Sequence, residues 1–334
     1  MESPRARSSR RRRRSRPLLA VVLAAVAVVG VTAGGTVYVQ AREHSGDEPV
    51  SSATATPSAS VSAYEAAGGE VPVDEVSVDE VPVDEVAVPE VDHDALLAEA
   101  MESVAVPGEA RVSVAVLALD SGAGATYGDS AFDTASIVKV DILAALLLQA
   151  QDAGRRLTTA EKTYAAAMIR NSDNDSASAL WRSIGAAKGL DAANERFGLT
   201  ATEGGAGMLW GLTQTTAADQ LTLLRQIFGT DSDSNSDSAL SAASRSYVQE
   251  LMGTIAAGQR WGVSAAADGS SWRLKNGWLA RSTTGLWDVN SIGRVTSGGS
   301  DYLVAVVSNG SATQAAGIAL VEAAARAAVT AVAG

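Results

Sequence analysis

The sequence predicts an α+β domain, an α/β sandwich with a five-stranded antiparallel sheet, flanking N- and C-terminal helices and an inserted all-α lobe. Two strand patterns come before a long helical stretch, and three more come after it. An alanine-rich helical pattern then closes the chain. Strands and helices segregated in this way favour one sheet covered by helices, with the helical stretch as a second lobe. A cleft between lobes is a common place for a site.

The predicted elements begin at residue 93. Asp92 or Asp94 can cap a first helix in ALLAEAMESV. The segment 111–119, RVSVAVLAL, predicts a strand, and SGAGATYGDS supplies a turn and a short second strand. Helical patterns then continue to about Met252.

Two helices of the middle stretch carry signals at their N-termini. Thr158 and Glu161 have the spacing of a capping box, and another helix starts near Thr216 and leads into QLTLLRQIF. The later strands are predicted in SWRLK, GLWDVNSIG and DYLVAVVS, and the closing helix in TQAAGIALVEAAARAAVTAV.

The composition excludes several kinds of active site. The chain has 334 residues, 46% of them hydrophobic, which suits one sizeable core. It has no cysteine, and its two histidines, His44 and His93, precede Asp94. A Ser–His–Asp triad, a thiolate nucleophile and a histidine-rich metal site are therefore excluded from the rest of the chain. A nucleophile there needs a lysine or a carboxylate as its base.

The N-terminal segments predict export. Residues 1–16 hold eight arginines, an expected cytoplasmic tail, and residues 17–39 are apolar and uncharged. A helix of that length rises roughly 34 Å, enough to cross a bilayer. Arginines on the N-terminal side predict a single-pass anchor in the cell membrane with an extracellular remainder. A cleaved signal peptide, and hence secretion, is the alternative, because 31–33 resembles a cleavage site; the length favours a retained anchor.

Residues 40–92 predict a disordered linker between this segment and the domain at 93–334. The linker combines a Ser/Thr/Pro-rich stretch with an acidic pentapeptide repeat, EVPVD, EVSVD, EVPVD, EVAVP. A five-residue period buries no face of a helix or sheet, and prolines remove backbone donors. Most of the formal net charge of −12 comes from this region, and a solvated stalk is favoured over a specific cation site.

The first catalytic candidates are Ser136 and Lys139, in TASIVKVDILAALLLQ. A polar stretch followed by an apolar helical pattern places Ser136 at a helix N-terminus, with Lys139 one turn later on the same face. A buried lysine with a lowered pKa can accept the serine proton, as a histidine-free site requires. The helix N-terminus offers backbone N–H groups to an oxyanion.

Two further motifs follow along the chain. Ser172 and Asn174, in Ser-Asp-Asn, stand between two helical patterns, where they can relay a proton and position an amide or serve as N-caps. Lys275, Asn276 and Gly277 stand in a late strand pattern, WRLKNGWL. A strand lysine can attract a carboxylate, and a glycine permits close backbone approach; an edge-strand lysine beside a glycine bulge is the alternative.

Together the ordered motifs Ser-x-x-Lys, Ser-Asp-Asn and Lys-x-Gly resemble those of the class A β-lactamases and the related penicillin-binding D,D-peptidases. The resemblance covers the chain from about residue 93 onward and implies the β-lactamase/transpeptidase-like fold. It implies that Ser136 is acylated, that Lys139 is its base, and that Ser172 passes a proton to the leaving nitrogen. Asn174 then orients substrate and Lys275 attracts the substrate carboxylate.

The resemblance also implies an oxyanion hole formed by the backbone N–H groups of Ser136 and Trp278, the residue after Gly277. Asn276 replaces the threonine of the family's third motif and can still donate a hydrogen bond to substrate. The Glu-x-x-Leu-Asn pattern of the class A omega loop is absent, and Glu203 is the only carboxylate in the corresponding region. Glu203 is either the deacylating base or an exposed loop residue, and its glycine neighbours favour the second interpretation.

The acidic spacing of 231–237 imitates the start of a calcium loop. Ser236 stands where glycine is required, and Ala242 where the bidentate glutamate belongs, which favours a polar loop without metal. We expect neither a cofactor nor nucleic-acid binding, because phosphate-binding motifs and a basic excess are absent from the folded region.

The sequence thus predicts a monomeric serine hydrolase whose substrate is a β-lactam or a peptidoglycan-like small molecule. Hydrolysis of the β-lactam amide through an acyl-Ser136 enzyme is one hypothesis. A D,D-peptidase or slow-deacylating penicillin-binding protein is the second. A non-catalytic domain that binds cell-wall peptides is the third.

Overall fold

The computed structural model of the chain describes residues 91–229, 238–269 and 271–333. The predicted tail, membrane segment and nearly all of the linker lie outside these residues, as does the calcium-like stretch 231–237. The helices are α1 (His93–Glu102), α2 (Val138–Asp152), α3 (Thr159–Arg170), α4 (Asn174–Ile184), α5 (Ala186–Phe197), α6 (Ala217–Phe228), α7 (Ala242–Met252) and α8 (Gln314–Val332). The strands are β1 (Arg111–Ala118), β2 (Gly124–Tyr127), β3 (Phe132–Asp133), β4 (Gln214–Thr215), β5 (Trp272–Ala280), β6 (Trp287–Ser297) and β7 (Ser300–Asn309).

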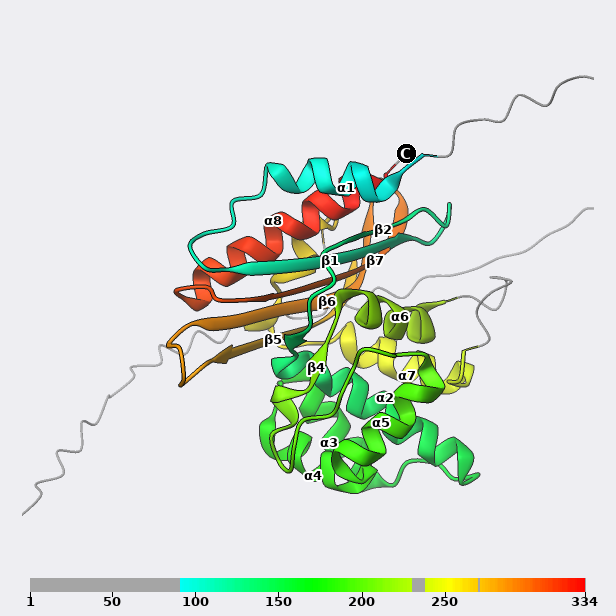
Figure 1. The fold of residues 1–334 in the computed structure, drawn as a ribbon. Helices are drawn as coiled ribbons and strands as arrows, with labels where there is room; N and C mark the ends of the chain where they lie inside the picture. The colour runs from blue at the N-terminus through cyan, green and yellow to red at the C-terminus, as the bar shows by residue number, and fades with distance from the viewer. Residues whose placement is uncertain (1–90, 230–237, 270, 334) are drawn as a thin grey trace, which may run out of the picture. The chain divides into compact units, whose positions relative to one another are not determined.

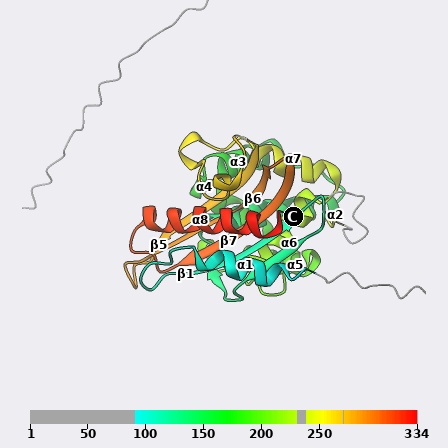
Figure 2. The same ribbon diagram turned by 90° about the horizontal axis from the view of Figure 1, so that it is seen from above.

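As the sequence predicts, five of the strands form one antiparallel sheet; the structure orders them β2-β1-β7-β6-β5. The short strands β3 and β4 pair with each other separately. Helices α1 and α8 cover one face of the sheet, and the helices from α2 to α7 lie on the other side (Figure 1). Viewed from above, α1 and α8 run side by side over the strands (Figure 2). The predicted all-α lobe is therefore an insertion between β2 and β5, and β5 is left as an edge strand.

Both faces of the central strand β7 are buried, which explains its nearly continuous apolar sequence, DYLVAVVS. Val304 and Val306 belong to the core that the sheet forms with α1 and α8. Leu303, Ala305 and Val307 belong to the core that it forms with the helical lobe. The alternation of the pleat thus divides one apolar run between two cores.

Helix α2 is the central helix of the lobe. Nearly every residue from Val138 to Leu148 is buried, and a helix that is apolar on all sides belongs inside a core. Because α2 is held from every direction, the residues at its N-terminus occupy a rigid position between the lobe and the sheet.

The predicted helix starts are confirmed. Asp92 caps α1, and Thr158 and Glu161 form the reciprocal capping box of α3. Thr216 caps α6 through the N–H of Asp219. Among the described helices, α8 alone is long and apolar enough to cross a membrane, and half of its most apolar stretch is buried within this domain.

Candidate active site

Ser136 lies in a short 3-10 turn, Ala135–Ile137, that leads directly into α2. The preceding residue, Ala135, has a φ of 47°, a left-handed conformation that is uncommon for residues other than glycine. Ser136 is partly exposed, and among the described residues its hydroxyl has no hydrogen-bond partner. The turn therefore presents a free hydroxyl where the helical lobe meets β5.

Lys139 is fully buried one turn further on. Its Nζ donates to the carbonyl oxygen of Ser172 at 2.6 Å, to the Ser172 Oγ at 3.0 Å and to the Asn174 Oδ1 at 2.8 Å. The predicted approach of Lys139 to the Ser136 hydroxyl is not formed in this arrangement, because all of its hydrogens are directed to the Ser-Asp-Asn loop.

Ser172 lies between two buried lysines. Its Oγ is 3.0 Å from the Nζ of Lys139 and 3.0 Å from the Nζ of Lys275, which comes from β5. Asp173, the next residue, caps α4 by accepting a hydrogen bond from the Ser176 N–H. The Ser-Asp-Asn loop therefore has two structural roles: Asp173 caps α4, and Ser172 connects the two lysines.

The two lysines differ from exposed lysines in their proton affinity. Burial lowers the pKa of Lys139 to about 7, although the nearby Asp173 carboxylate acts in the opposite direction. Burial, reinforced by the charge of Lys139, holds the pKa of Lys275 well below its usual range. Low-dielectric surroundings disfavour an ammonium, so a neutral amine is available at Lys139 near neutral pH.

Lys275 and Asn276 point to opposite faces of β5. Lys275 is fully buried toward Ser172, so it is not the solvent-facing edge lysine of the alternative interpretation. The Asn276 amide donates to the carbonyl oxygens of Gln259 and Trp261, and its Oδ1 accepts from Ser291. The expected donation from Asn276 to substrate is therefore not supported, because the protein already occupies every hydrogen-bonding group of this side chain.

Gly277 brings β5 against the turn that carries the candidate nucleophile. A Cβ at this position would lie 2.7 Å from the Ser136 nitrogen and 2.8 Å from both the Ile137 nitrogen and the Thr134 oxygen. The next residue, Trp278, lines the same pocket as Ser136, while its ring packs against Trp261 with a centroid distance of 5.9 Å. Only glycine permits this approach, which is the structural basis of Lys-x-Gly in this chain.

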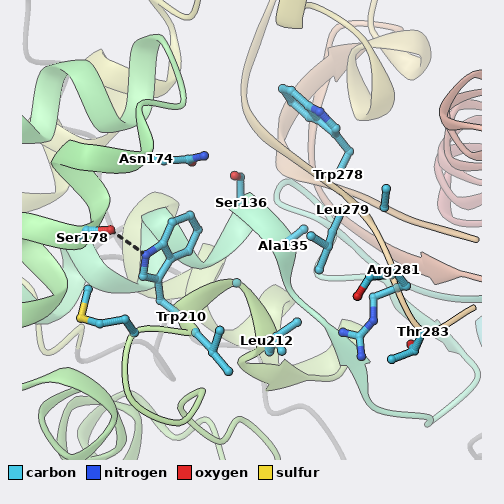
Figure 3. A pocket seen from close by; sticks show the side chains of 15 residues that line it. Ala135, Ser136, Asn174, Ser178, Trp210, Leu212, Trp278, Leu279, Arg281 and Thr283 are labelled. Atoms are coloured by element: carbon cyan, nitrogen blue, oxygen red, sulfur yellow. Dashed lines mark hydrogen bonds between the residues drawn. The ribbon is translucent and has the colours of Figure 1, made fainter. Parts of the chain in front are cut away.

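A pocket of about 550 Å³ opens at Ser136 (Figure 3). One wall follows the end of β5 and the residues after it, and the other is the segment from Met208 to Leu212. The lining residues are Ala135, Ser136, Asn174, Ser178, Met208, Leu209, Trp210, Gly211, Leu212, Trp278, Leu279, Ala280, Arg281, Ser282 and Thr283. This set contains no carboxylate.

Glu203 is exposed and does not line the pocket. The loop it begins is nevertheless held closely: Glu203 pairs with Gln214, and a Cβ on Gly205 would lie 2.2 Å from the Leu209 oxygen. The glycines thus serve tight packing of the loop. Within residues 91–229, 238–269 and 271–333, no group of three acidic or histidine side chains could hold a metal ion.

Trp210 is not among the residues predicted from the sequence motifs, yet its ring centroid lies 5.0 Å from the Lys139 Nζ. Its indole N–H donates to the Ser178 Oγ at 3.2 Å (Figure 3). The chain has only six tryptophans, and one of them stands in the same loop as Glu203, which is a signal that the sequence offers. Nothing in the sequence alone placed its ring against Lys139.

No protein-family model matches the chain, and no curated protein matches it. Solved structures do match. The TLA-1 extended-spectrum β-lactamase is 14% identical with a TM-score of 0.62, over 72% of this chain and 98% of that one. A β-lactamase from Xanthomonas campestris pv. campestris is 22% identical with a TM-score of 0.56, over 72% and 97%. A mutant of PBP-A, in an acyl-enzyme complex with penicillin G, is 21% identical with a TM-score of 0.59, over 71% and 96%.

These similarities show the fold. The described domain has the α+β architecture of the β-lactamases and penicillin-binding proteins, with the five-stranded antiparallel sheet and inserted helical lobe that the sequence predicts.

Proposed function

We propose that this domain is a penicillin-binding serine enzyme that is acylated on Ser136 and releases the acyl group slowly. The observation that carries the proposal is the position of the Ser172 hydroxyl, 3.0 Å from two buried lysines and beside the pocket that Ser136 lines. Two buried amines with lowered proton affinity around one hydroxyl form a proton path, and such perturbed groups gather at functional sites.

Acylation starts with neutral Lys139, which turns from the Ser-Asp-Asn loop and takes the proton of the Ser136 hydroxyl. Hydrogen bonds at a catalytic base often tighten only when substrate is bound. The Ser136 Oγ then bonds to the carbonyl carbon of the β-lactam, and the oxyanion is held by the backbone N–H groups of Ser136 and Trp278.

The ring C–N bond breaks in the second half of the reaction. The leaving nitrogen takes a proton from the Ser172 hydroxyl, and Lys139, now protonated, returns a proton to Ser172. Lys275 donates to the same hydroxyl and attracts the substrate carboxylate, while Asn174 orients the substrate amide. Each proton removed from Ser136 is thereby delivered to the leaving group, and the enzyme remains as an ester.

Slow release is favoured over rapid β-lactam hydrolysis because the pocket lining has no carboxylate and Glu203 is exposed outside it. A water molecule that attacks the ester needs a base within hydrogen-bonding reach. A D,D-peptidase acting on peptidoglycan stem peptides is the second candidate. It is favoured by the pocket wall along β5, since an edge strand can pair with an extended peptide.

The test is intact-mass analysis of the full-length chain in detergent after mixing with a penicillin, beside Ser136→Ala. The expected result is one covalent adduct on wild type, persisting for hours, and none on the variant. Loss of the adduct within seconds would indicate a β-lactamase instead. No adduct at high penicillin concentration would reject acylation by β-lactams and leave a peptide substrate or a binding-only domain.

We also propose that residues 17–39 anchor the chain in the cell membrane with 93–334 outside. The arginine-rich flank and the length of the apolar segment support this. The chain should stay with membranes after an alkaline wash and be digested by protease added to intact cells. Release of a shortened chain into the medium would indicate a cleaved signal peptide instead.

A further inference from the structure

Trp210 is fixed in its position by the neighbouring helix α4. Its indole N–H donates to Ser178, and the indole N–H of Trp181, also on α4, donates to the Gly207 carbonyl at 2.7 Å. The loop carrying Trp210 is also tied to the segment before Ser136, because the Thr134 N–H donates to the Thr213 carbonyl. The indole is therefore a fixed part of the site.

The Trp210 indole both lines the pocket and lies next to the Lys139 amine. Its ring lies over the ammonium at 5.0 Å, and it lines the same pocket as Ser136. In Figure 3 the ring lies beside Ser136, on the side of the pocket formed by α4 and this loop. Lys139 has no exposed surface, although its partner Ser172 is partly exposed and its partner Asn174 is exposed. Trp210 is thus an aromatic side chain placed between pocket-lining atoms and the buried amine.

Hydrolysis of an acyl-Ser136 ester requires that the bond between the Ser136 Oγ and the acyl carbon break as a water oxygen bonds to that carbon. The proton of the water goes to a base, and the Ser136 oxygen regains a proton. The pocket lining holds no carboxylate, whereas Lys139, one turn after Ser136, is an amine that can be neutral near pH 7 and could take the proton. Water that cannot reach Lys139 cannot be activated by it.

We infer that Trp210 is a positioning residue that shields Lys139 from water and so makes the acyl-enzyme long-lived. This inference rests on the proposed acylation of Ser136. In this inference the Trp210 indole occupies the place in which a hydrolysing enzyme needs an activated water. Slow release then depends on a packed side chain as well as on a missing base.

The experiment measures the loss of the penicillin adduct by intact mass for the full-length wild type, Trp210→Ala and Trp210→Phe. Trp210→Ala should lose its adduct about 10²-fold faster, the scale of general-base assistance. That loss should also quicken as pH rises and Lys139 is deprotonated. Trp210→Phe keeps a ring over the amine and should stay close to wild type. Glu203→Gln, on the same loop but outside the pocket, is the matched control and should match wild type.

Two readouts separate shielding from a general structural effect. A loosened loop would slow adduct formation and lower the melting temperature. Loss of shielding would instead make the adduct decay faster, and faster still as pH rises. If Trp210→Ala does not fold, Ser178→Ala, which frees the indole N–H, carries the test and should shorten the adduct lifetime several-fold. The inference is overturned if the adduct of Trp210→Ala, or of Ser178→Ala where Trp210→Ala does not fold, lasts as long as that of wild type. It is also overturned if the wild-type adduct decays in seconds. Absence of any wild-type adduct would instead reject the proposed function.

Discussion

Ser172 has a φ of 55°, a left-handed backbone conformation that costs a non-glycine residue on the order of 1 kcal/mol. Its carbonyl and hydroxyl both accept hydrogen bonds from Lys139, and its hydroxyl also accepts from Lys275. The strained backbone thus turns both oxygens of one residue toward the lysines. Strain of this kind persists where the surroundings hold it and is typical of functional sites.

The first prediction is that Ser172→Ala slows acylation of Ser136 by about 10²–10⁴-fold, the range for loss of a positioned proton donor. The variant keeps the backbone and the Asp173 cap, so its melting temperature should stay close to that of wild type. Adduct formation against time, followed by intact mass, is the measurement. A variant acylated at the wild-type rate would show that the leaving nitrogen receives its proton elsewhere.

The second prediction concerns pH. Because burial lowers the pKa of Lys139 to about 7, the neutral base should become available as pH rises through about 7. The acylation rate should therefore increase between about pH 5 and pH 8 and then level off. Lys139→Arg, which stays protonated, should form no adduct across that range. A pH-independent acylation rate in wild type would exclude Lys139 as the base.

At this scale the sequence predicted which residues meet but not all of their orientations. Lys139, Ser172 and Lys275 were predicted to share a site from motif order, and they do converge. Asn276 was assigned to substrate because the pattern gives a residue type and not a strand face. The face depends on pairing with β6, which places Ser291 beside Asn276. Such long-range register cannot be obtained from a three-residue motif.

At the scale of elements, the site depends on the close contact between β5 and the turn before α2. The third prediction is that Gly277→Ala reduces acylation at least about tenfold, because the new Cβ would meet three backbone atoms of the turn at 2.8 Å or less. The strand must then move away from Ser136 and displace the Trp278 N–H. Gly258→Ala is the matched control: a Cβ there meets nothing within 4 Å. Equal loss in both variants would refute the predicted contact.

Elements with local signals were predicted well. The caps at Asp92, Thr158 and Thr216 and the apolar strand patterns depend on residues close in sequence. The loop 203–214 was harder to predict, because its conformation depends on glycines packed against distant backbone and on two indole N–H groups bound to other segments. Its packing against α4 and Lys139 therefore could not be predicted from the sequence.

At the scale of the whole molecule, the helical lobe and the sheet share a core into which α2 inserts two polar side chains. Lys139 lies at the candidate site, whereas Asp141, two residues further along α2, is buried away from the pocket at 1% exposure. Its Oδ1 accepts from Gln220 at 3.1 Å, but its Oδ2 and the Gln220 Oε1 are buried without a partner. Two buried acceptors without a donor favour a protonated carboxyl.

The last prediction follows from this group. Burial raises the pKa of Asp141 to about 7, helped by the nearby Asp219 carboxylate. Because this folded-state pKa lies above the unfolded value of about 3.9, stability is complete below that value and is lost as pH rises toward and through 7. At about 1.4 kcal/mol per pKa unit, the loss is on the order of 4 kcal/mol. Relative to an Asp141→Asn variant, the wild-type melting temperature should therefore fall between about pH 4 and pH 7 and then level off.

Asp141→Asn removes the ionisation and places an amide donor at this buried position, so it should raise the melting temperature at about pH 8.5 and remove the fall between about pH 4 and pH 7. Some slope should remain, because burial and Asp133 also raise the pKa of Asp288 to about 7. Burial lowers the pKa of Lys139 to about 7, which makes stability rise with pH above that value. Thermal unfolding of the full-length chain across this pH range, for both proteins, is the measurement. If wild type and Asp141→Asn show the same pH dependence of the melting temperature, Asp141 is ionised in the folded state, and the buried oxygen must then have found a proton donor. Because Asp141 lies outside the pocket, acylation of Ser136 at pH 7 should proceed at a similar rate in both proteins.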